Sequence, residues 1–447
     1  MGAPQHPRLG EYDDQPASVR TAPERQPVST DPTLLDDLQW RGLIAHSTDL
    51  DDLRNALAES SVRFYVGFDP TAPSLHMGHL VQVLTAKRLQ LAGHKPFALV
   101  GGATGMIGDP RESGERVLNS LDTVKEWVGK VRDQIAPFLS FEGANAATMV
   151  NNYDWTASLS TIDFLRDIGK HFPVNRMLAR DVVARRLEAG ISYTEFSYVL
   201  LQSMDFLNLY RDHGVTLQFG GSDQWGNLTA GVELIRRVTG GKAHAFATPL
   251  LTKADGTKYG KTEGGALWLD AAMMSPYSFH QFWLNVEDEK VGELLRVFTF
   301  LEREEIEALE KQTAEEPWKR AGQKVLADEV TTLVHGVAET EQAKTAAAAL
   351  FGTGDLRQLG PATLTAALRE AGAVTAPPGT GIVDLLVDTG LVKSKGEARR
   401  TIGEGGAYLN NQRVTDPDYV PGGPDLLHGS WLVLRRGKKN LAGVQVG

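Results

Sequence analysis

A short strand that leads directly into a helix is the feature that most restricts how this chain can fold. Residues 64–68 form an apolar run, residues 69–70 (Asp-Pro) interrupt it, and helix-forming residues resume at Ser74 and continue to Gly93. Units of this kind are typical of α/β folds that are built on a parallel sheet. We therefore expect an α/β fold.

The helix of this unit begins with two histidines. Side chains three positions apart lie about 60° apart around a helix, so His76 and His79 should share a face. Gly78 lies between them and leaves the backbone open to a ligand. A metal site, ordinary hydrogen-bonded histidines and a polyphosphate site remain open, but zinc needs more ligands than these and the chain has no cysteine. We expect no protein-bound metal, and the phosphate interpretation depends on motifs later in the chain.

Two further polar turns follow expected strands. Residues 96–100 lead into the glycine-rich stretch 101–110, onto which the dinucleotide fingerprint G-x-G-x-x-G cannot be laid. This stretch is either a structural turn or a loop that something approaches closely, with Thr104 and Asp109 as its polar side chains. Residues 217–219 end in GGSDQWGN before another helix, which predicts a second half of the same parallel sheet.

A long helix is expected at residues 194–211, and it carries three polar side chains on one face. Tyr198, Gln202 and Asp205 follow one another at spacings of four and three. The flanking sequence FSYVLLQSMDFL is too apolar for a solvated face, so part of this trio should be buried and should need hydrogen-bond partners. We expect a small polar ligand to supply them.

A cationic, glycine-containing segment occupies residues 250–262. Lys258, Lys261 and Thr262 are groups that bind phosphate oxygens. The segment is similar to a P-loop, but Asp255 stands where the Walker pattern requires glycine.

Together, these motifs resemble those of the bacterial tyrosyl-tRNA synthetases, which are class I aminoacyl-tRNA synthetases. The first signature of the class, usually written HIGH, reads HMGH at residues 76–79, and the second, usually KMSKS, reads KYGKT at residues 258–262. GFDPTAPSLHMGHL and GGSDQWGN narrow the resemblance to tyrosine-specific enzymes. The resemblance extends from Leu34 to the C-terminus.

The resemblance implies a role for each site residue. The residues expected to bind tyrosine are Tyr65 and Asp205 at its phenol, Asp109, Tyr198 and Gln202 at its amino group, and Gln224 at its carboxylate. The residues expected to bind ATP are Gly67, Asp69, His76, Gly78, His79, Asp223, Lys258 and Lys261. The residues expected to be catalytic are His76, His79, Thr71, Lys258, Lys261 and Thr262. The residues expected to bind RNA are Lys393, Lys395, Arg399, Arg400 and Arg413, with Arg116 as a further contact to the tRNA end or to phosphate.

The resemblance also implies the reaction and the partners. The family joins L-tyrosine to tRNA(Tyr) with ATP, aided by Mg²⁺, through a tyrosyl-adenylate, and its members are homodimers. We expect the dimer interface between residues 122 and 186. Because the sequence contains neither a run of ~20 apolar residues nor the apolar core of a signal peptide, we expect a cytoplasmic protein with no membrane contact.

The expected domain organisation follows the motifs and the composition. We expect a disordered extension at residues 1–33, a Rossmann-like catalytic domain with a helical insertion at 34–264, an α-helical domain at 265–370, a linker at 371–380 and a small α+β RNA-binding domain at 381–447. The chain of 447 residues has a net charge of -10, yet residues 391–447 contain nine Lys/Arg and only five Asp/Glu. This local excess of positive charge gives the C-terminal part a partner that the rest of the chain does not share.

Three other interpretations remain open. A tryptophan-specific relative would share the fold but would have no use for a phenol-binding Tyr and Asp pair. An enzyme that adenylylates a small molecule would not need a basic RNA-binding domain. A non-catalytic RNA-binding protein on the same scaffold would not need intact HMGH and KYGKT motifs.

Overall fold

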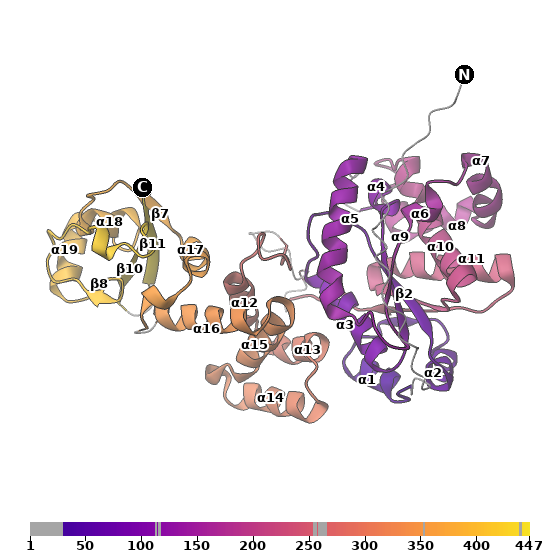
Figure 1. Ribbon diagram of the computed structural model, residues 1–447, viewed down its shortest axis with the longest axis horizontal. Helices are drawn as coiled ribbons and strands as arrows, with labels where there is room; N and C mark the ends of the chain where they lie inside the picture. The colour runs from indigo at the N-terminus through magenta and orange to yellow at the C-terminus, as the bar shows by residue number, and fades with distance from the viewer. Residues whose placement is uncertain are drawn as a thin grey trace, which may run out of the picture.

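The computed structural model describes residues 30–111, 114, 118–253, 257, 266–351, 354–437 and 440–447. Figure 1 shows these residues as a large lobe built around a sheet, a group of helices beside it, and a small lobe that contains the C-terminus. The predicted α/β class, with a helical part and a small α+β part after the sheet, is confirmed.

The described residues of the large lobe form a six-stranded sheet with the order β1-β6-β5-β2-β3-β4. Its strands are β1 (His46–Ser47), β2 (Arg63–Phe68), β3 (Lys95–Val100), β4 (Thr148–Asn151), β5 (Leu217–Gly221) and β6 (His244–Thr248). All neighbouring pairs are parallel except β1 and β6. Strands β3 and β4 extend the sheet on one side of β2, and β5 and β6 extend it on the other. The strand order therefore reverses between β2 and β5, where open α/β sheets bind their ligands.

Helices cover both faces of this sheet (Figure 1). They are α1 (Leu34–Trp40), α2 (Leu50–Glu59), α3 (Met77–Leu91), α4 (Thr104–Ile107), α5 (Leu121–Ile135), α6 (Tyr153–Thr156), α7 (Thr161–Asp163), α8 (Val174–Leu178), α9 (Asp181–Ala184), α10 (Tyr193–His213) and α11 (Trp225–Thr239). Successive β2 side chains enter opposite cores: Phe64 packs in the same core as Leu84 of α3, and Tyr65 in the same core as Phe206 of α10. Burial on both faces explains why β2 is a continuous apolar run.

Helix α3 begins three residues later than the sequence predicts. Met77 is its first residue and His76 is its N-cap, so the predicted start at Ser74 is wrong. The reason is a tertiary contact, because the residues before the helix pair with a distant segment. The Met77 amide donates to the Leu267 carbonyl (3.0 Å), and the Leu269 amide donates to the Leu75 carbonyl (2.9 Å). These bonds hold the chain extended before the helix starts.

The middle of the molecule is helical, as predicted. Its helices are α12 (Pro276–Leu284), α13 (Asp288–Phe298), α14 (Arg303–Glu315), α15 (Ala321–His335), α16 (Val337–Phe351) and α17 (Pro361–Glu370). Trp283 of α12 and Phe298 of α13 are fully buried here and belong to the same apolar core as β2 and α3. The helical part is therefore packed directly onto the large lobe.

The C-terminal part contains a second sheet of five described strands with the order β7-β11-β10-β8-β9. Its elements are β7 (Val374–Ala376), α18 (Ile382–Asp388), α19 (Lys395–Gly403), β8 (Ala407–Leu409), β9 (Gln412–Arg413), β10 (Trp431–Arg436) and β11 (Asn440–Val446). One sheet face packs on α18 and α19, and the other packs on α16 and α17. The stretch 371–380, expected to be a linker, contains strand β7, which pairs with β11.

The expected N-terminal extension lies almost entirely outside the described residues. Of its last residues, Thr30 donates to the Ala58 carbonyl (3.1 Å) and the Asp31 amide donates to the Ala92 carbonyl (3.2 Å), so both are anchored to the large lobe. Among the helices that the structure describes, none has the combination of length and apolar character that crossing a bilayer demands.

Candidate active site

The sequence-predicted residues of the large lobe gather at the carboxyl edge of the sheet. Asp69 follows β2, Thr104 follows β3, Asn152 follows β4 and Asp223 follows β5. Helix α10 runs along the sheet from this edge, with Tyr198 beside Asp69 and its last residue, His213, beside the start of β2, and it adds Asp205. Parallel strands place their carboxyl ends together, which is why segments far apart in the sequence meet here.

A buried hydrogen-bond chain begins at Asp69. One oxygen of this carboxylate accepts from the Tyr198 hydroxyl (2.6 Å), and the other accepts from the Thr104 hydroxyl (2.6 Å). Burial, followed by the charges of Asp69 and Asp109, raises the pKa of Tyr198 well above its ordinary value. The Tyr198 hydroxyl therefore remains protonated and lies among negative charges.

The same chain continues to Asp205, which is 2% exposed. The Asn152 side-chain amide donates both to the Thr104 hydroxyl (2.8 Å) and to Asp205 (3.0 Å), and the Trp155 indole donates to the other Asp205 oxygen (2.9 Å). Burial raises the pKa of Asp205 to about 7, although the two donors act in the opposite direction. Asp205 is thus a carboxyl group whose charge changes near neutral pH.

Tyr65 and Gln202 complete this part of the site. Tyr65 is 1% exposed, packs against Phe206, and its hydroxyl lies 3.5 Å from the backbone carbonyl of Gln202. Burial, and then the charges of Asp205 and Asp69, raises its pKa well above the ordinary value. The side-chain oxygen of Gln202 is buried without a hydrogen-bond donor among the described residues. This oxygen can accept a bond from a ligand.

Two members of the trio on α10, Tyr198 and Asp205, are buried, which confirms the prediction that part of it is buried, and both already have hydrogen-bond partners within the protein. Tyr198 bonds to Asp69, and Asp205 bonds to Asn152 and Trp155, all within the protein. The side-chain oxygen of Gln202 is the group of this trio that lacks a donor among the described residues. The sequence shows the helical face, but it does not show that side chains from the segments after β2 and β4 reach it.

A second polar cluster surrounds Asp109. Its carboxylate accepts from the side-chain amides of Gln224 (2.7 Å) and Asn227 (3.2 Å), and Asn227 also donates to Gln224 (2.8 Å). Arg180 donates a further hydrogen bond to the side-chain oxygen of Asn227. Because Asp109 also influences the pKa of Tyr198, this cluster adjoins the Asp69 chain.

The loop that carries Asp109 is held by a buried arginine. Arg186 donates to the carbonyl of Arg111 (2.6 Å), to the carbonyl of Gly190 (3.2 Å) and to Glu195 (3.2 Å). Both members of the Arg186–Glu195 pair are almost fully buried. The contact fixes the backbone two residues beyond Asp109.

The glycine-rich turn after β3 is approached closely by the protein itself. A Cβ atom at Gly101 would overlap Asp69, and one at Gly102 would overlap Asn151. A Cβ atom at Gly105 would lie 2.8 Å from Pro70. The neighbours that require glycine are side chains of the Asp69 and Asn151 segments, so the protein's own packing accounts for the glycines of this turn.

His76 and His79 stack on one another, as the sequence predicts, with ring centroids 3.9 Å apart. The Gly78 amide donates to Nδ1 of His76 (3.1 Å), and the His76 amide donates to Nδ1 of His79 (3.2 Å). Burial lowers the pKa of both imidazoles, and the neighbouring His76 lowers that of His79 further. Both rings are therefore neutral at pH 7 with Nδ1 as an acceptor, which leaves the proton on Nε2 as a donor.

The KYGKT segment at residues 258–262, with Lys258, Lys261 and Thr262, lies outside the described residues, as does Arg116. The residues that follow the KYGKT segment are described from residue 266 onward. Residues 267–269 pair with residues 75–77, and Trp268 forms a β-bridge with His76. The chain that leaves the second signature is thus bonded to the first signature.

The remaining predicted residues of this lobe are exposed at the same edge. Gly67 is exposed near the end of β2, and a Cβ atom there would meet its nearest neighbour at an ordinary 3.9 Å. Thr71 and Asp223 are also exposed, in the turns that follow β2 and β5. No group of three or more His, Asp or Glu side chains within the described residues is arranged to hold a metal ion.

The predicted RNA-binding residues lie on the surface of the C-terminal part and have acidic neighbours. Lys395 pairs with Asp384 (2.7 Å), Arg399 with Asp418 (3.1 Å), and Arg400 lies 4.0 Å from Glu404. These three cations are 54–70% exposed. Lys393 and Arg413 are exposed as well.

Sequence reasoning missed five side chains of the site. They are Asn152, Trp155, Arg180, Arg186 and Asn227. The first two lie in the sequence NNYDW at the end of β4, and that position was the available signal because strand ends line such sites. The two arginines carried no comparable signal.

The chain was compared with families and structures of known proteins. A family model of class I tRNA synthetases (W and Y) matches residues 57–352, and a model of the tyrosine–tRNA ligase SYY-like C-terminal domain matches residues 366–444. The tyrosine–tRNA ligase of Streptomyces coelicolor is 63% identical over 416 residues, which cover 92% of this chain and 99% of the relative. That of Kineococcus radiotolerans is 61% identical over 413 residues, which cover 92% and 98%.

Solved structures agree with these matches. A C-terminally truncated mitochondrial tyrosyl-tRNA synthetase from Coccidioides posadasii is 32% identical, with a TM-score of 0.62, over 69% of this chain and 90% of that chain. The corresponding enzyme from Aspergillus nidulans is 31% identical, with a TM-score of 0.63, over 69% and 92%. The resemblance drawn from the motifs is confirmed, and the chain belongs to the tyrosine–tRNA ligases, the tyrosyl branch of the class I aminoacyl-tRNA synthetases.

Proposed function

We propose that this chain ligates L-tyrosine to tRNA(Tyr) in two steps. A carboxylate oxygen of tyrosine attacks the α-phosphorus of ATP, which forms tyrosyl-adenylate as pyrophosphate leaves. The 3′-terminal ribose of the tRNA then takes the tyrosyl group and releases AMP. The observation that carries this proposal is the group of carboxylates around Tyr198, namely the buried Asp205 and the partly buried Asp69 and Asp109, at the same carboxyl edge of the sheet as the stacked histidines.

The carboxylates around Tyr198 suit the amino-acid substrate. Asp69 and Asp109 both act on Tyr198, and the free acceptor of Gln202 lies on the same helix, so an ammonium group is favoured here. We assign the α-amino group to Asp109, Tyr198 and Gln202, and the carboxylate to Gln224. Tyr65 and Asp205, which are almost fully buried, would bind the phenol.

The exposed edge of the sheet suits ATP. The substrate carboxylate is ionised at neutral pH and needs no general base, so the enzyme must stabilise charge on the phosphoryl oxygens. The neutral His76 and His79 can donate Nε2 protons to these oxygens. The remaining groups that we assign to ATP and its transition state are Gly67, Asp69, Thr71, Gly78, Asp223, Lys258, Lys261 and Thr262.

We also propose that Mg²⁺ takes part. Because the described residues form no metal site of their own, the triphosphate would supply most of the ligands, as it does for Mg²⁺ at many nucleotide sites. Bound there, Mg²⁺ would neutralise charge on the departing pyrophosphate.

The first prediction concerns tyrosine-dependent exchange of labelled pyrophosphate into ATP. The unaltered chain should support exchange with tyrosine and not with tryptophan. Asp205→Ala should lower kcat/KM for tyrosine about 10- to 100-fold, from about 1.5–3 kcal/mol for a hydrogen bond to a charged group, with little change in the KM for ATP. Ser203→Ala is a matched control, because Ser203 is buried on the same helix and bonds to its own turn. Equal losses for tyrosine and ATP in Asp205→Ala would contradict the assignment.

The second prediction concerns pH. Since the pKa of Asp205 is raised to about 7, the carboxylate that accepts the substrate phenol becomes fully charged only above this pH. The KM for tyrosine should therefore fall several-fold between pH 6 and pH 8, and Asp205→Asn should remove this dependence.

The stability of the folded protein should decrease over the pH range in which tyrosine binding improves. Between about pH 4 and pH 7 the folded protein holds the Asp205 proton more tightly than the unfolded chain does, so the free energy of unfolding should fall as pH rises. Urea unfolding at several pH values measures this slope, which should be smaller in Asp205→Asn. Identical slopes in the two proteins would show that Asp205 is ionised throughout.

The third prediction concerns RNA. We propose that Lys393, Lys395, Arg399, Arg400 and Arg413 bind tRNA phosphates. Replacing Lys395, Arg399 and Arg400 by glutamine should lower kcat/KM for tRNA about tenfold and reduce the salt slope of binding by about 2–3, while exchange stays unchanged. Deletion of the whole C-terminal part would be harder to interpret, because its sheet also covers apolar residues of α16 and α17.

The control neutralises three cations of the large lobe instead, Arg54, Arg211 and Lys242. It should leave the tRNA parameters unaltered. Equal salt slopes in the two triple variants would refute the assignment.

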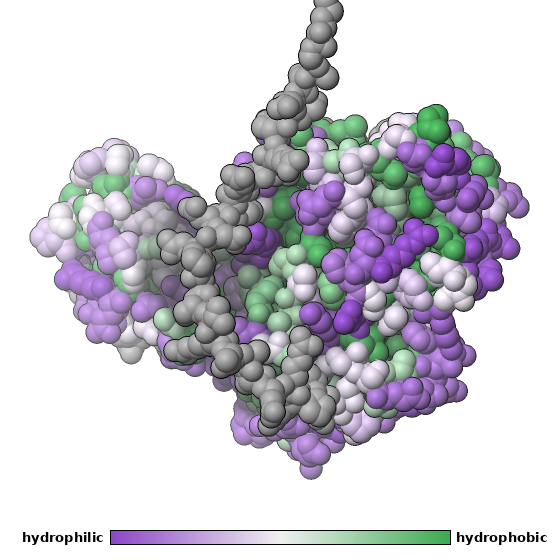
Figure 2. Space-filling model, turned by 45° about the vertical axis from the view of Figure 1, so that its right-hand side comes forward, coloured by the Kyte–Doolittle hydropathy of each residue, from purple (hydrophilic) through white to green (hydrophobic). Residues whose placement is uncertain are grey.

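The fourth prediction concerns a homodimer. Exposed apolar side chains collect between residues 118 and 193 in the part of the chain that the structure describes. They are Leu118, Leu121, Phe141, Ile162, Leu165, Val174, Leu178, Leu187 and Tyr193. Figure 2 shows green patches among the purple ones on the lobe that contains this region. Such a concentration is typical of an interface, and we propose that it joins two copies across the segment 122–186.

Sedimentation velocity tests this proposal. The double variant Ile162→Asp and Val174→Asp should sediment as a monomer, because each side chain is more than 60% exposed and a buried charge opposes association. The pair Val337→Asp and Val420→Asp, at exposed apolar positions outside the segment, should remain dimeric. A monomeric unaltered chain would rule the interface out.

We propose in addition that the units at residues 34–264, 265–370 and 381–447 act as catalytic, helical and RNA-binding domains. Strand β7 extends the C-terminal unit upstream to residue 374, so the link from the helical unit is shorter than the expected 371–380. The cytoplasm, where tRNA is charged for translation, is the proposed site of action.

A further inference from the structure

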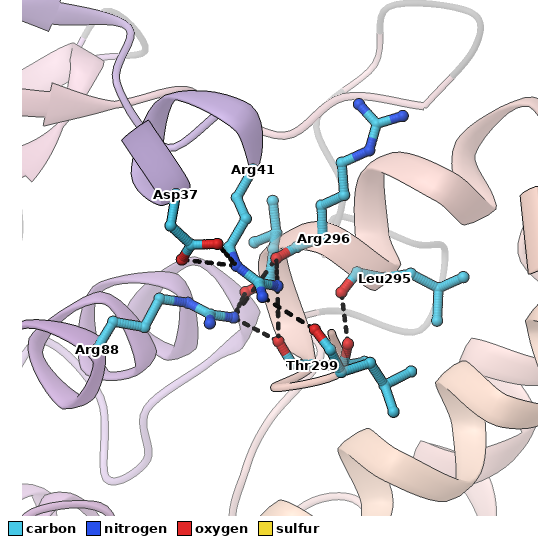
Figure 3. Close-up of polar contacts among 8 residues, drawn as sticks. Asp37, Arg41, Arg88, Leu295, Arg296 and Thr299 are labelled. Atoms are coloured by element: carbon cyan, nitrogen blue, oxygen red, sulfur yellow. Dashed lines mark hydrogen bonds and ion pairs between the residues drawn. The ribbon is translucent and has the colours of Figure 1, made fainter. Parts of the chain in front are cut away.

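Two arginines of the large lobe converge on the end of a helix in the middle of the molecule (Figure 3). Arg41, which follows α1, donates to the carbonyls of Arg296 (3.0 Å), Thr299 (3.2 Å) and Leu301 (2.9 Å). Arg88, in the last turn of α3, donates to the same Thr299 carbonyl and approaches that of Val297 (3.4 Å). The acceptors are the last carbonyls of α13 and those just beyond it, which no further helical turn would satisfy.

The two buried arginine charges at this junction need the carbonyl groups at the end of α13 as partners. Arg41 and Arg88 are each 6% exposed, and the carboxylate that pairs with Arg41 is Asp37 (2.9 Å), which is partly exposed. Burial, and then the charge of Arg41, lowers the pKa of Arg88 to about 9. Two buried guanidinium groups thus face one carboxylate and the negative end of the α13 dipole, whose carbonyls supply the remaining compensation.

Aromatic rings interlock the same two parts. The guanidinium of Arg88 lies over Phe300, 4.4 Å from the ring centre. In the reverse direction, Arg303 of the helical part lies over Trp40 of the large lobe at 4.6 Å. An arginine on each side of the junction therefore packs over an aromatic ring of the other side. These two contacts fix the relative orientation of the two parts as well as their separation.

Helix α3 connects this junction with the active site. His76 and His79 lie at its first turn and Arg88 lies at its last turn, and most of the residues between them are buried. On the other side, α13 packs on α15, α15 packs on α16, and the sheet of the C-terminal part packs on α16 and α17. One continuous series of packed elements thus joins the stacked histidines to the cationic C-terminal surface.

We propose that Arg41 and Arg88 form a clamp that sets the orientation of the helical and C-terminal parts relative to the adenylate site. They act as positioning residues for the transfer of tyrosine to tRNA, and they take no part in forming the adenylate. This proposal rests on the proposed use of the C-terminal part for tRNA.

The experiment compares pyrophosphate exchange with tRNA charging in the full-length protein. Arg88→Met should lower kcat/KM for tRNA at least tenfold, mainly through KM, and should change exchange less than twofold. Arg88→Lys should restore part of the loss, because an ammonium group still reaches the Thr299 carbonyl but not several carbonyls at once. Arg63→Met is the matched control, since Arg63 donates to the last carbonyl of α10 (His213, 2.6 Å) entirely within the large lobe. It should leave the ratio of charging to exchange unchanged.

A distance measurement separates positioning from folding. The chain has no cysteine, so Glu59→Cys on α2 and Glu307→Cys on α14 accept two spin labels without further changes. Pulsed electron resonance should give a narrow distance distribution in the parent protein and a broader or displaced one with Arg88→Met or Arg41→Lys.

Two results would overturn the clamp. One is an unchanged distance distribution in both arginine variants, and the other is a parallel loss of exchange and charging in Arg88→Met. Failure of the proposed function would look different, because the unaltered chain would then not charge tRNA at all.

Discussion

The site depends on two carboxylates of the large lobe, Asp205, which is fully buried, and Asp69, which is partly buried. A buried carboxylate is costly unless donors surround it, and here Tyr198, Thr104, Asn152 and Trp155 supply them. These donors come from α10 (Tyr198), from the start of α4 (Thr104) and from the segment that follows β4 (Asn152 and Trp155). The arrangement therefore exists only when the parallel sheet is assembled in its observed order.

The same carboxylates explain features that look unrelated in the sequence. Gly101 must be glycine because Asp69 and Thr104 occupy the space that a Cβ atom would take. The turn after β3 is thus shaped by the carboxylate that it covers. Polar groups that are fixed before a ligand arrives need little rearrangement when it binds, which favours both selectivity and rate.

Sequence reasoning predicted the parts of this structure that local pattern controls. Strand β2, the polar face of α10 and the stacked His76 and His79 all follow from periodicity, because the period of an element decides which side chains share a face. It failed where distant segments decide the outcome. Ser74 has helix-forming neighbours, but pairing of residues 75–77 with 267–269 keeps it out of the helix. Strands β1 and β6 were missed as well.

The functional residues also divide into those that a local pattern reveals and those that depend on distant segments. Signature residues are visible as short motifs, whereas Asn152, Arg180 and Arg186 matter through partners that lie far from them in the sequence. Family resemblance carries the first kind of residue from one chain to another. The second kind requires the assembled sheet, since nothing in the neighbouring sequence shows which carbonyl or carboxylate an arginine will meet.

The junction between the large lobe and the helical part also depends on polar contacts between segments that are distant in the sequence. An apolar contact alone tolerates sliding, because its free energy depends mainly on buried area. Hydrogen bonds from Arg41 and Arg88 to the carbonyls that end α13 are directional, and they are available only where that helix stops. A protein that must present a bound adenylate to the far end of a large RNA gains from such a contact, since a small rotation at the junction becomes a large displacement at the C-terminal surface.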